Sequence, residues 1–117
     1  VRLARMDGLA ALRPVPQFDL IVSNPPYVTP EDYPGLQPEV RDHEPQSALV
    51  GGPVGLEIPQ RLIGQIARCA KPGAPVLMEH GMEQGAALRD AAHAAGLRDI
   101  RTEKDYAGLD RILVARA

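Results

Sequence analysis

The sequence predicts an α/β fold in which helices cover a mostly parallel sheet with an antiparallel hairpin at its end. Short apolar runs rich in β-branched residues lie at 18–23, 75–79 and 111–115. One segment of helical periodicity lies between the first and second runs, and another lies between the second and third. This alternation is typical of a parallel sheet covered by helices.

Each strand is predicted from its own composition. The run at 18–23 (FDLIVS) is continuous and apolar, which is typical of a parallel strand buried on both faces. Residues 98–103 (RDIRTE) are polar enough for an edge strand. The turn of the terminal hairpin is expected at 105–110, so the strand at 111–115 should run antiparallel to its neighbour.

Two helices are predicted between the strands. Residues 56–70 place apolar side chains three or four positions apart, which gives one buried stripe. Pro59 is compatible with the first turn, because that turn needs no intrahelical N–H donor. Lys71, Pro72 and Gly73 end this helix. A second helix is expected at 83–95, with Gly96 ending it.

A long proline-rich segment at 25–53 separates the first strand from the first helix. It holds seven of the twelve prolines and shows no periodicity, and loops of this kind are usually functional or disordered. Its five acidic residues and one arginine give it a net charge of −4, against +2 for the rest of the chain. It follows the carboxyl end of a parallel strand, where open α/β sheets bind their ligands.

Length and composition exclude several classes. The 117 residues allow one domain at most, and no apolar run approaches the roughly 20 residues needed to cross a bilayer. No signal peptide is seen, and the single cysteine, Cys69, excludes an internal disulfide or a cysteine-built zinc site. The net charge of −2 does not indicate the excess of basic residues that is typical of proteins that bind nucleic acid. Because the chain begins at Val1, within what reads as a strand, we expect a piece of a longer domain.

Asn24-Pro25-Pro26-Tyr27 stands at the end of the first strand. The four residues could be an ordinary turn, with Tyr27 as a packing aromatic. A functional interpretation starts from the two prolines, which restrict the backbone and remove two N–H donors. The side-chain oxygen of Asn24 and the carbonyls of Asn24 and Pro25 remain as acceptors. A planar NH₂ group could donate both hydrogens to them while Tyr27 stacks on its face, so the motif predicts a site for an amide or amino group.

The stretch FDLIVSNPPYV resembles the motif of S-adenosylmethionine-dependent methyltransferases that alkylate planar nitrogens. Downstream, the chain resembles the peptide chain release factor glutamine methyltransferases of the HemK/PrmC type. This resemblance runs in order through nearly the whole chain. The matching pieces are RDHEP at 41–45, AL at 48–49, GG at 51–52, GL at 55–56, EHG at 79–81, QG at 84–85 and DYAGLDR at 105–111.

The resemblance implies a cytoplasmic enzyme that methylates the glutamine amide nitrogen in the Gly-Gly-Gln loop of release factors, in translation termination. S-Adenosylmethionine would be the cofactor and a release factor the partner, with no metal or membrane and with nucleic acid disfavoured. Asn24, Pro25 and Tyr27 would be catalytic, and the same three with Pro26 would bind the substrate.

The resemblance also implies cofactor contacts from Asp7, Gly8 and Asn24. Asp7 would accept a hydrogen bond from the exocyclic amine of the adenine, with the Gly8 backbone beside it. The alternative is a surface or helix-capping aspartate, because MDGLAAL also reads as the start of a helix. Glu79 and His80 match the family pattern without a derivable catalytic role. We expect Glu79 to orient loop backbone and His80 to be structural.

By the same resemblance, residues 1–117 form a partial domain, the carboxyl-terminal half of a Rossmann-like class I methyltransferase sheet. This half would bind the acceptor, because no glycine-rich cofactor turn follows a strand. We therefore expect weak or no binding of S-adenosylmethionine by the chain alone. We also expect self-association through the apolar edge FDLIV.

Three other functions stay open. A nucleic-acid amino-group (adenine) methyltransferase would suit the same motif, but the acidic loop would repel a phosphate backbone. A ribosomal protein glutamine methyltransferase shares the motif, and the Asp110-Arg111 ending favours release factors over it. The third is an inactive truncated remnant, for which the intact Asn-Pro-Pro-Tyr indicates a recent or artificial truncation and not long decay.

Overall fold

The computed structural model describes residues 2–117 and holds one four-stranded sheet in the order β1-β2-β4-β3. The strands are β1 (Ile21–Ser23), β2 (Pro75–Glu79), β3 (Arg98–Lys104) and β4 (Asp110–Arg116). β1 is parallel to β2, and β4 is antiparallel to both β2 and β3. The mixed α/β class and the terminal hairpin are therefore confirmed. Three strands run one way, but β4 lies between two of them, so only one neighbouring pair is parallel and the sheet is less parallel than predicted.

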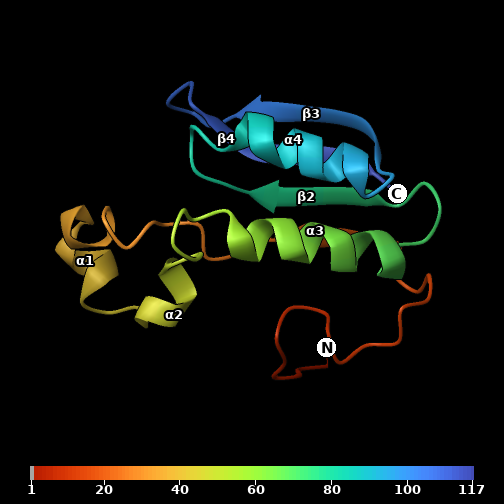
Figure 1. Ribbon diagram of the computed structural model, residues 1–117, viewed down its shortest axis with the longest axis horizontal. Helices are drawn as coiled ribbons and strands as arrows, with labels where there is room; N and C mark the ends of the chain where they lie inside the picture. Colours follow the sequence, from red (N-terminus) through yellow and green to blue (C-terminus); the bar gives the residue numbers. More distant parts are fainter. Residues whose placement is uncertain (1) are drawn as a thin grey trace.

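Two helices, α3 (Glu57–Cys69) and α4 (Gly85–Ala94), pack on one face of the sheet (Figure 1). Along β2, Val76 and Met78 are fully buried toward the helices, whereas Leu77 between them is only partly buried. This alternation shows a two-layer fold with one well-covered sheet face. The buried core consists of Ile63, Ile66, Val76, Met78, Leu88, Ala92, Leu97, Leu113 and Ala115.

Both long helices occur where the periodicity predicts them. α3 buries the expected stripe, with Ile63 and Ile66 almost completely excluded from solvent. α4 begins two residues later than predicted, because residues 81–84 form a turn in which the Gln84 N–H donates to the Gly81 carbonyl at 3.0 Å. It ends before Gly96, whose φ of 85° is a conformation that glycine adopts without strain.

The first strand differs most from its prediction. Only residues 21–23 of the expected 18–23 form β1, and Phe18 makes an isolated bridge to Ala70. Val22 is 69% exposed and Leu20 is 54% exposed, so burial on both faces is wrong for this strand. Among residues 2–117, β1 is an edge strand with no further neighbour. An apolar run predicts burial only where a neighbouring strand and covering layer are present.

The N-terminal segment forms turns. The expectation of a strand at Val1 lies outside the described residues, and residues 2–6 that follow are not in a strand. The Ala10 N–H donates to the Asp7 carbonyl at 3.1 Å, and that of Leu12 to the Leu9 carbonyl at 3.0 Å. The interpretation of Asp7 as a helix cap is therefore wrong, because no helix begins here.

The proline-rich segment is folded into three short helices beyond the carboxyl end of β2 (Figure 1). They are η1 (Tyr33–Gly35), α1 (Pro38–Arg41) and α2 (Gln46–Leu49), each too short to leave a periodic pattern. Val28 ties the segment together, because its N–H donates to the Leu49 carbonyl at 2.9 Å and its carbonyl accepts from Gly51 at 3.0 Å. The segment is thus a structured wall beside the sheet.

Neither a membrane-spanning helix nor a metal-binding cluster occurs among residues 2–117. The longest described helix, α3, has 13 residues, and no helix in the described part combines the length and apolarity that a membrane span requires. Residues 2–117 also contain no cluster of three or more His, Cys, Asp or Glu side chains able to hold a metal ion. Cys69 is buried in α3, as expected of a small core residue.

We predict concentration-dependent self-association through the open edge of β1, because unpaired N–H and C=O groups beside exposed apolar side chains favour strand pairing. Val22→Lys should shift the chain toward monomer in sedimentation velocity runs over a concentration series. Val54→Lys is the matched control, because Val54 is 60% exposed but lies in a loop. Equal association of the two variants would contradict a role for the β1 edge.

Candidate functional site

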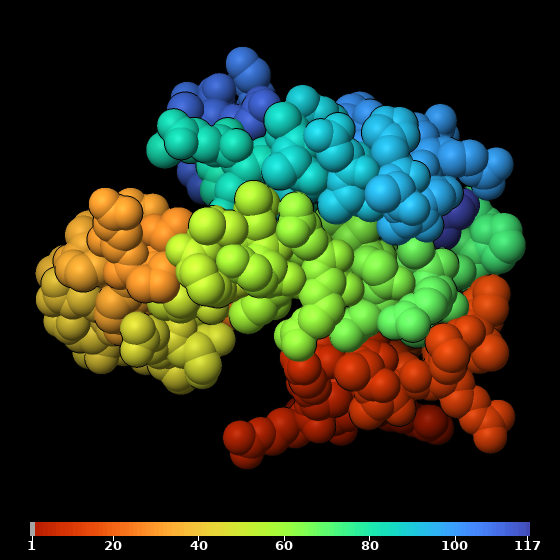
Figure 2. Space-filling model, in the orientation of Figure 1, coloured from red at the N-terminus to blue at the C-terminus, as the bar shows by residue number. Residues whose placement is uncertain are grey.

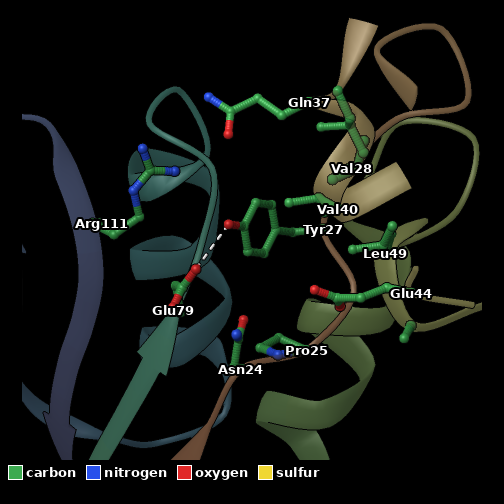
Figure 3. A pocket seen from close by; sticks show the side chains of 12 residues that line it. Asn24, Pro25, Tyr27, Val28, Gln37, Val40, Glu44, Leu49, Glu79 and Arg111 are labelled. Carbon is green, nitrogen blue, oxygen red and sulfur yellow. Dashed lines mark hydrogen bonds between the residues drawn. The ribbon is translucent and has the colours of Figure 1, made fainter. Parts of the chain in front are cut away.

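A cavity of about 600 Å³, here the large cavity, opens at the carboxyl ends of β1 and β2 (Figure 3). Asn24, Pro25 and Tyr27 line it from the predicted motif, and Glu79 and Arg111 line it from the sheet. The opposite wall comes from the proline-rich segment and is mostly apolar. Its residues are Val28, Leu36, Gln37, Val40, Glu44, Ala48 and Leu49.

The start of the motif presents acceptors to this cavity. Asn24 directly follows β1 and is exposed, whereas Pro25 is buried. The Asn24 side chain and the carbonyls of Asn24 and Pro25 take no part in the loop and side-chain hydrogen bonds found within residues 2–117. These oxygens can therefore accept hydrogen bonds from a ligand.

Tyr27 projects its ring into the large cavity and fixes its hydroxyl on the sheet side. The hydroxyl donates to Oε1 of Glu79 at 2.8 Å (Figure 3). Burial has the largest effect and raises the pKa of the Tyr27 phenol. The hydrogen bond to Glu79 and the negative charge of Glu79 also raise this pKa, while Arg111 acts to lower it. The phenol therefore stays neutral at physiological pH and offers its ring faces to the cavity.

The backbone of the motif is held by Gln84, at the start of α4. Its Nε2 donates to the Tyr27 carbonyl at 2.9 Å and to the Gly55 carbonyl at 3.1 Å. Its Oε1 accepts from the Gly81 N–H at 3.0 Å. One side chain thus joins the motif, the loop before α3 and the turn after β2.

Two glycines allow the backbone chains to lie this close. A Cβ on Gly51 would collide with the Pro26 carbonyl oxygen and lie 2.8 Å from the Tyr27 Cα. Gly55 has a φ of +73°, and a Cβ there would collide with the Tyr27 carbonyl oxygen. The glycines and Gln84 were noted in the sequence only as matching pieces. The structure assigns them to supporting the motif.

Arg111 connects the terminal hairpin to the large cavity. Its Nε lies 3.2 Å from Oδ2 of Asp105, and its Nη1 donates to the His80 carbonyl at 3.4 Å. The Leu109 N–H, with further help from Arg111 and the Ala107 N–H, lowers the pKa of the Asp105 carboxyl. Asp105 therefore remains charged and holds both the hairpin turn and Arg111.

Glu79 and His80 differ from each other in role. Glu79 accepts from a side-chain hydroxyl rather than from loop backbone, so the expectation for it is wrong. His80 is fully buried, with Nδ1 2.7 Å from the Gly81 carbonyl oxygen, which fits a structural histidine. Its Nε2 has no hydrogen-bond partner among the described residues.

A second cavity of about 330 Å³, here the small cavity, lies between the N-terminal turns, α3 and the proline-rich segment. Figure 2 shows a hollow between the N-terminal segment and the region of α2, below α3. Asp7, Gly8, Pro25, Pro26, Ser47 and Arg61 are among the residues that line it. Pro25 lines both cavities, so a single residue separates them at this point.

The two residues predicted upstream of the motif are both engaged at the small cavity. Oδ1 of Asp7 pairs with Nη2 of Arg61 at 2.7 Å. Gly8 has a φ of +57°, and a Cβ there would collide with Oε1 of Gln65. The same Oε1 accepts from the Leu9 N–H at 2.7 Å and fixes the turn. Sequence reasoning gave no signal for Arg61 or Gln65, because their partners are more than 50 positions away.

The structure therefore divides the predicted site residues between two places. Asn24, Pro25 and Tyr27 line the large cavity, and Asp7, Gly8, Pro25 and Pro26 line the small one. Asn24 lines only the large cavity, although it was also predicted on the cofactor side.

Comparison with known proteins shows extended sequence similarity. The chain is 45% identical over 97 residues to the release factor glutamine methyltransferase of Caulobacter vibrioides, covering 83% of this chain and 34% of that protein. It is 42% identical over 114 residues to the protein of that name from Bifidobacterium longum, covering 97% and 36%. It is 39% identical over 122 aligned positions to the protein of that name from Gloeobacter violaceus, covering 100% of this chain and 41% of that protein. No family model matches.

These relatives, which are named as methyltransferases, define the class of protein that the chain resembles over most of its length. In this chain an Asn-Pro-Pro-Tyr segment lies between two cavities. By sequence it belongs to the release factor glutamine methyltransferase family. The chain spans between 34% and 41% of the length of the relatives compared here.

We predict that Gly51→Ala destabilises the chain by about 1–3 kcal/mol, because the new methyl group meets backbone atoms of the motif that cannot move aside cheaply. Gly64→Ala is the matched control: nothing lies within 4 Å of a Cβ there, and alanine favours its helix by up to about 1 kcal/mol. Urea unfolding measures both. Equal stability of the two variants would show that the close approach at Gly51 is unimportant.

Proposed function

We propose that residues 1–117 form the acceptor-binding part of a Rossmann-like class I methyltransferase domain. The reaction is transfer of a methyl group from S-adenosylmethionine to the glutamine side-chain nitrogen in the Gly-Gly-Gln loop of a peptide chain release factor. The observation that carries the proposal is the position of the 24–27 motif. Its unused acceptors line the large cavity, while Pro25 also borders the small one. The names of the relatives support the choice of acceptor.

The acceptor amide requires help because its nitrogen lone pair is delocalised into the carbonyl group. In the proposal the Asn24 side-chain oxygen and the Pro25 carbonyl accept the two amide hydrogens. These hydrogen bonds fix the direction of the nitrogen and favour its pyramidal form. They also aim negative dipoles at an atom that becomes positive, so positioning and electrostatics supply most of the rate gain. The proton can leave after transfer, so no strong base is needed beforehand.

Tyr27 and the apolar wall complete the acceptor site. The neutral Tyr27 ring offers a flat surface against the plane of the amide, and Val40 and Leu49 reduce contact with water. Glycines beside the acceptor glutamine suit this cavity, because a residue without a side chain lets the glutamine reach deep into it.

The small cavity fits the adenosine end of the cofactor in its chemistry. Arg61 holds one oxygen of the Asp7 carboxylate, which leaves the other to accept from an adenine amino group. Pro25 and Pro26 supply an apolar surface, and the Gly8 backbone lies beside Asp7. In the proposal Asn24 meets the acceptor in the large cavity, and the adjoining Pro25, which lines both cavities, brings it next to the methyl end of the cofactor. When bound, S-adenosylmethionine supplies an electrophilic methyl group on a positively charged sulfur.

Charge around the large cavity supports a protein acceptor over a nucleic acid. Glu44 and Glu79 line the cavity together with one cation, Arg111, which is already paired with Asp105. The surrounding segment at 25–53 has five acidic residues and one arginine. A phosphate backbone would be repelled here, whereas a neutral peptide loop would not.

We predict that Asn24→Ala lowers methyl transfer by about 100-fold or more, because it removes an acceptor aimed at the reacting nitrogen. The measurement uses a chimera in which this chain replaces the matched 114-residue stretch of the Bifidobacterium longum relative, with labelled S-adenosylmethionine and release factor. Asn24→Asp, which keeps an oxygen acceptor, should retain part of the activity. Activity of Asn24→Ala within a few-fold of the parent would exclude the proposed role.

We also predict that the label enters release factor alone when release factor, ribosomal protein and DNA are offered to the chimera in parallel. Replacing the glutamine of the Gly-Gly-Gln loop by glutamate should abolish labelling, since a carboxylate has no hydrogens to donate to Asn24 and Pro25. Labelled ribosomal protein or labelled DNA would identify the corresponding alternative acceptor instead.

A further inference from the structure

We propose that Glu79 is a positioning residue that holds the hydroxyl of Tyr27 at the sheet side of the large cavity, beside the charge of Arg111, and so sets where the ring stands against an acceptor amide. The link to an amide rests on the proposed function. The fixing of the ring rests on the geometry alone.

Tyr27 is held at both ends. Gln84 binds its carbonyl at 2.9 Å, and Glu79 accepts from its hydroxyl at 2.8 Å. A ring tethered only through its backbone could still swing about χ1 and carry its hydroxyl away from the sheet. With the hydroxyl held by Glu79 as well, that swing is lost before a ligand arrives, so the binding step does not have to place the ring.

Glu79 is itself placed by the sheet. It is the last residue of β2 and stands opposite Ile112 of β4, so its side chain starts from a paired position in the sheet. In Figure 3 its carboxylate points toward the Tyr27 hydroxyl, with Arg111 on the same side of the cavity. An ionised acceptor also makes the stronger kind of hydrogen bond. The position of the Tyr27 ring is therefore set by the sheet and not by the loop that carries Tyr27.

Arg111 adds a cation beside the same hydroxyl. Its guanidinium is fixed by Asp105 at 3.2 Å and by the His80 carbonyl at 3.4 Å, so it cannot swing into a close ion pair elsewhere. Asp105 is in turn bound by the N–H groups of Ala107 and Leu109 at 2.9 and 3.0 Å. The hairpin turn, remote in sequence from the motif, thereby acts on the electrostatics of Tyr27.

Absorbance titration of tyrosine at 295 nm tests the proposal on the chain itself. Glu79 and Arg111 act on the phenol in opposite directions, so Glu79→Gln should lower the pKa of Tyr27 and Arg111→Gln should raise it. Tyr27→Phe removes one of the three tyrosine transitions and so assigns it. Glu83→Gln, an exposed glutamate four residues after Glu79, is the matched control and should leave the transition in place. Circular dichroism at each pH confirms that the chain stays folded.

Opposite shifts in the two variants would support the proposal. Shifts in the same direction, or none, would overturn it, because a variant that merely loosens the structure exposes the phenol and lowers its pKa in both cases. If Glu79→Gln fails to fold, the Arg111→Gln variant decides the test alone. A raised pKa of Tyr27 in that variant would support the proposal, and an unchanged or lowered pKa would overturn it. No methyl transfer is involved, so this result is independent of the outcome for Asn24→Ala.

Discussion

The site depends on the close approach of two backbone segments that are separate in the sequence. They are the 24–27 motif and the loop before α3 that carries Gly51 and Gly55. Gly51 and Gly55 leave no side chain between them, and Gln84 joins their carbonyls from the start of α4. The N–H groups of the proline-rich segment bond mostly within the segment, and Gln84 adds a donor from α4 that fixes the Tyr27 carbonyl from outside it.

The parts of the fold that the sequence predicts are those with a local physical cause. α3 and α4 follow from apolar spacing, and Gly96 ends α4 because its positive φ suits glycine. The hairpin follows from a turn between two strand-forming runs. The exposure of Val22 could not be predicted, because it depends on which strands stand beside β1 and not on the residue itself. The three helices of the proline-rich segment were missed because three or four residues are too few to show a period.

A similar division holds for the site. Asn24, Pro25 and Tyr27 could be named because a compact motif follows a strand, and strand ends are where such sheets bind ligands. The hydrogen bond from Tyr27 to Glu79 joins residues 52 positions apart, and the local sequence around neither residue predicts it. Arg61 was missed for the same reason, since its partner Asp7 is 54 positions away. Side chains that support a site through long-range contacts need the fold before they can be recognised.

The wall opposite the sheet has a further consequence for how a bulky ligand could enter. α1 and α2 contain no fully buried residue. The backbone bonds at Val28 and the Tyr33 hydroxyl bound to the Arg41 carbonyl hold the segment to itself. A segment without a core of its own opens at a much lower free energy than the helices and sheet unfold. The motif is anchored to the sheet and α4, so it would keep its geometry while this wall swings aside. A folded protein loop, far wider than a free amino acid, could then be admitted without disturbing the groups that orient it.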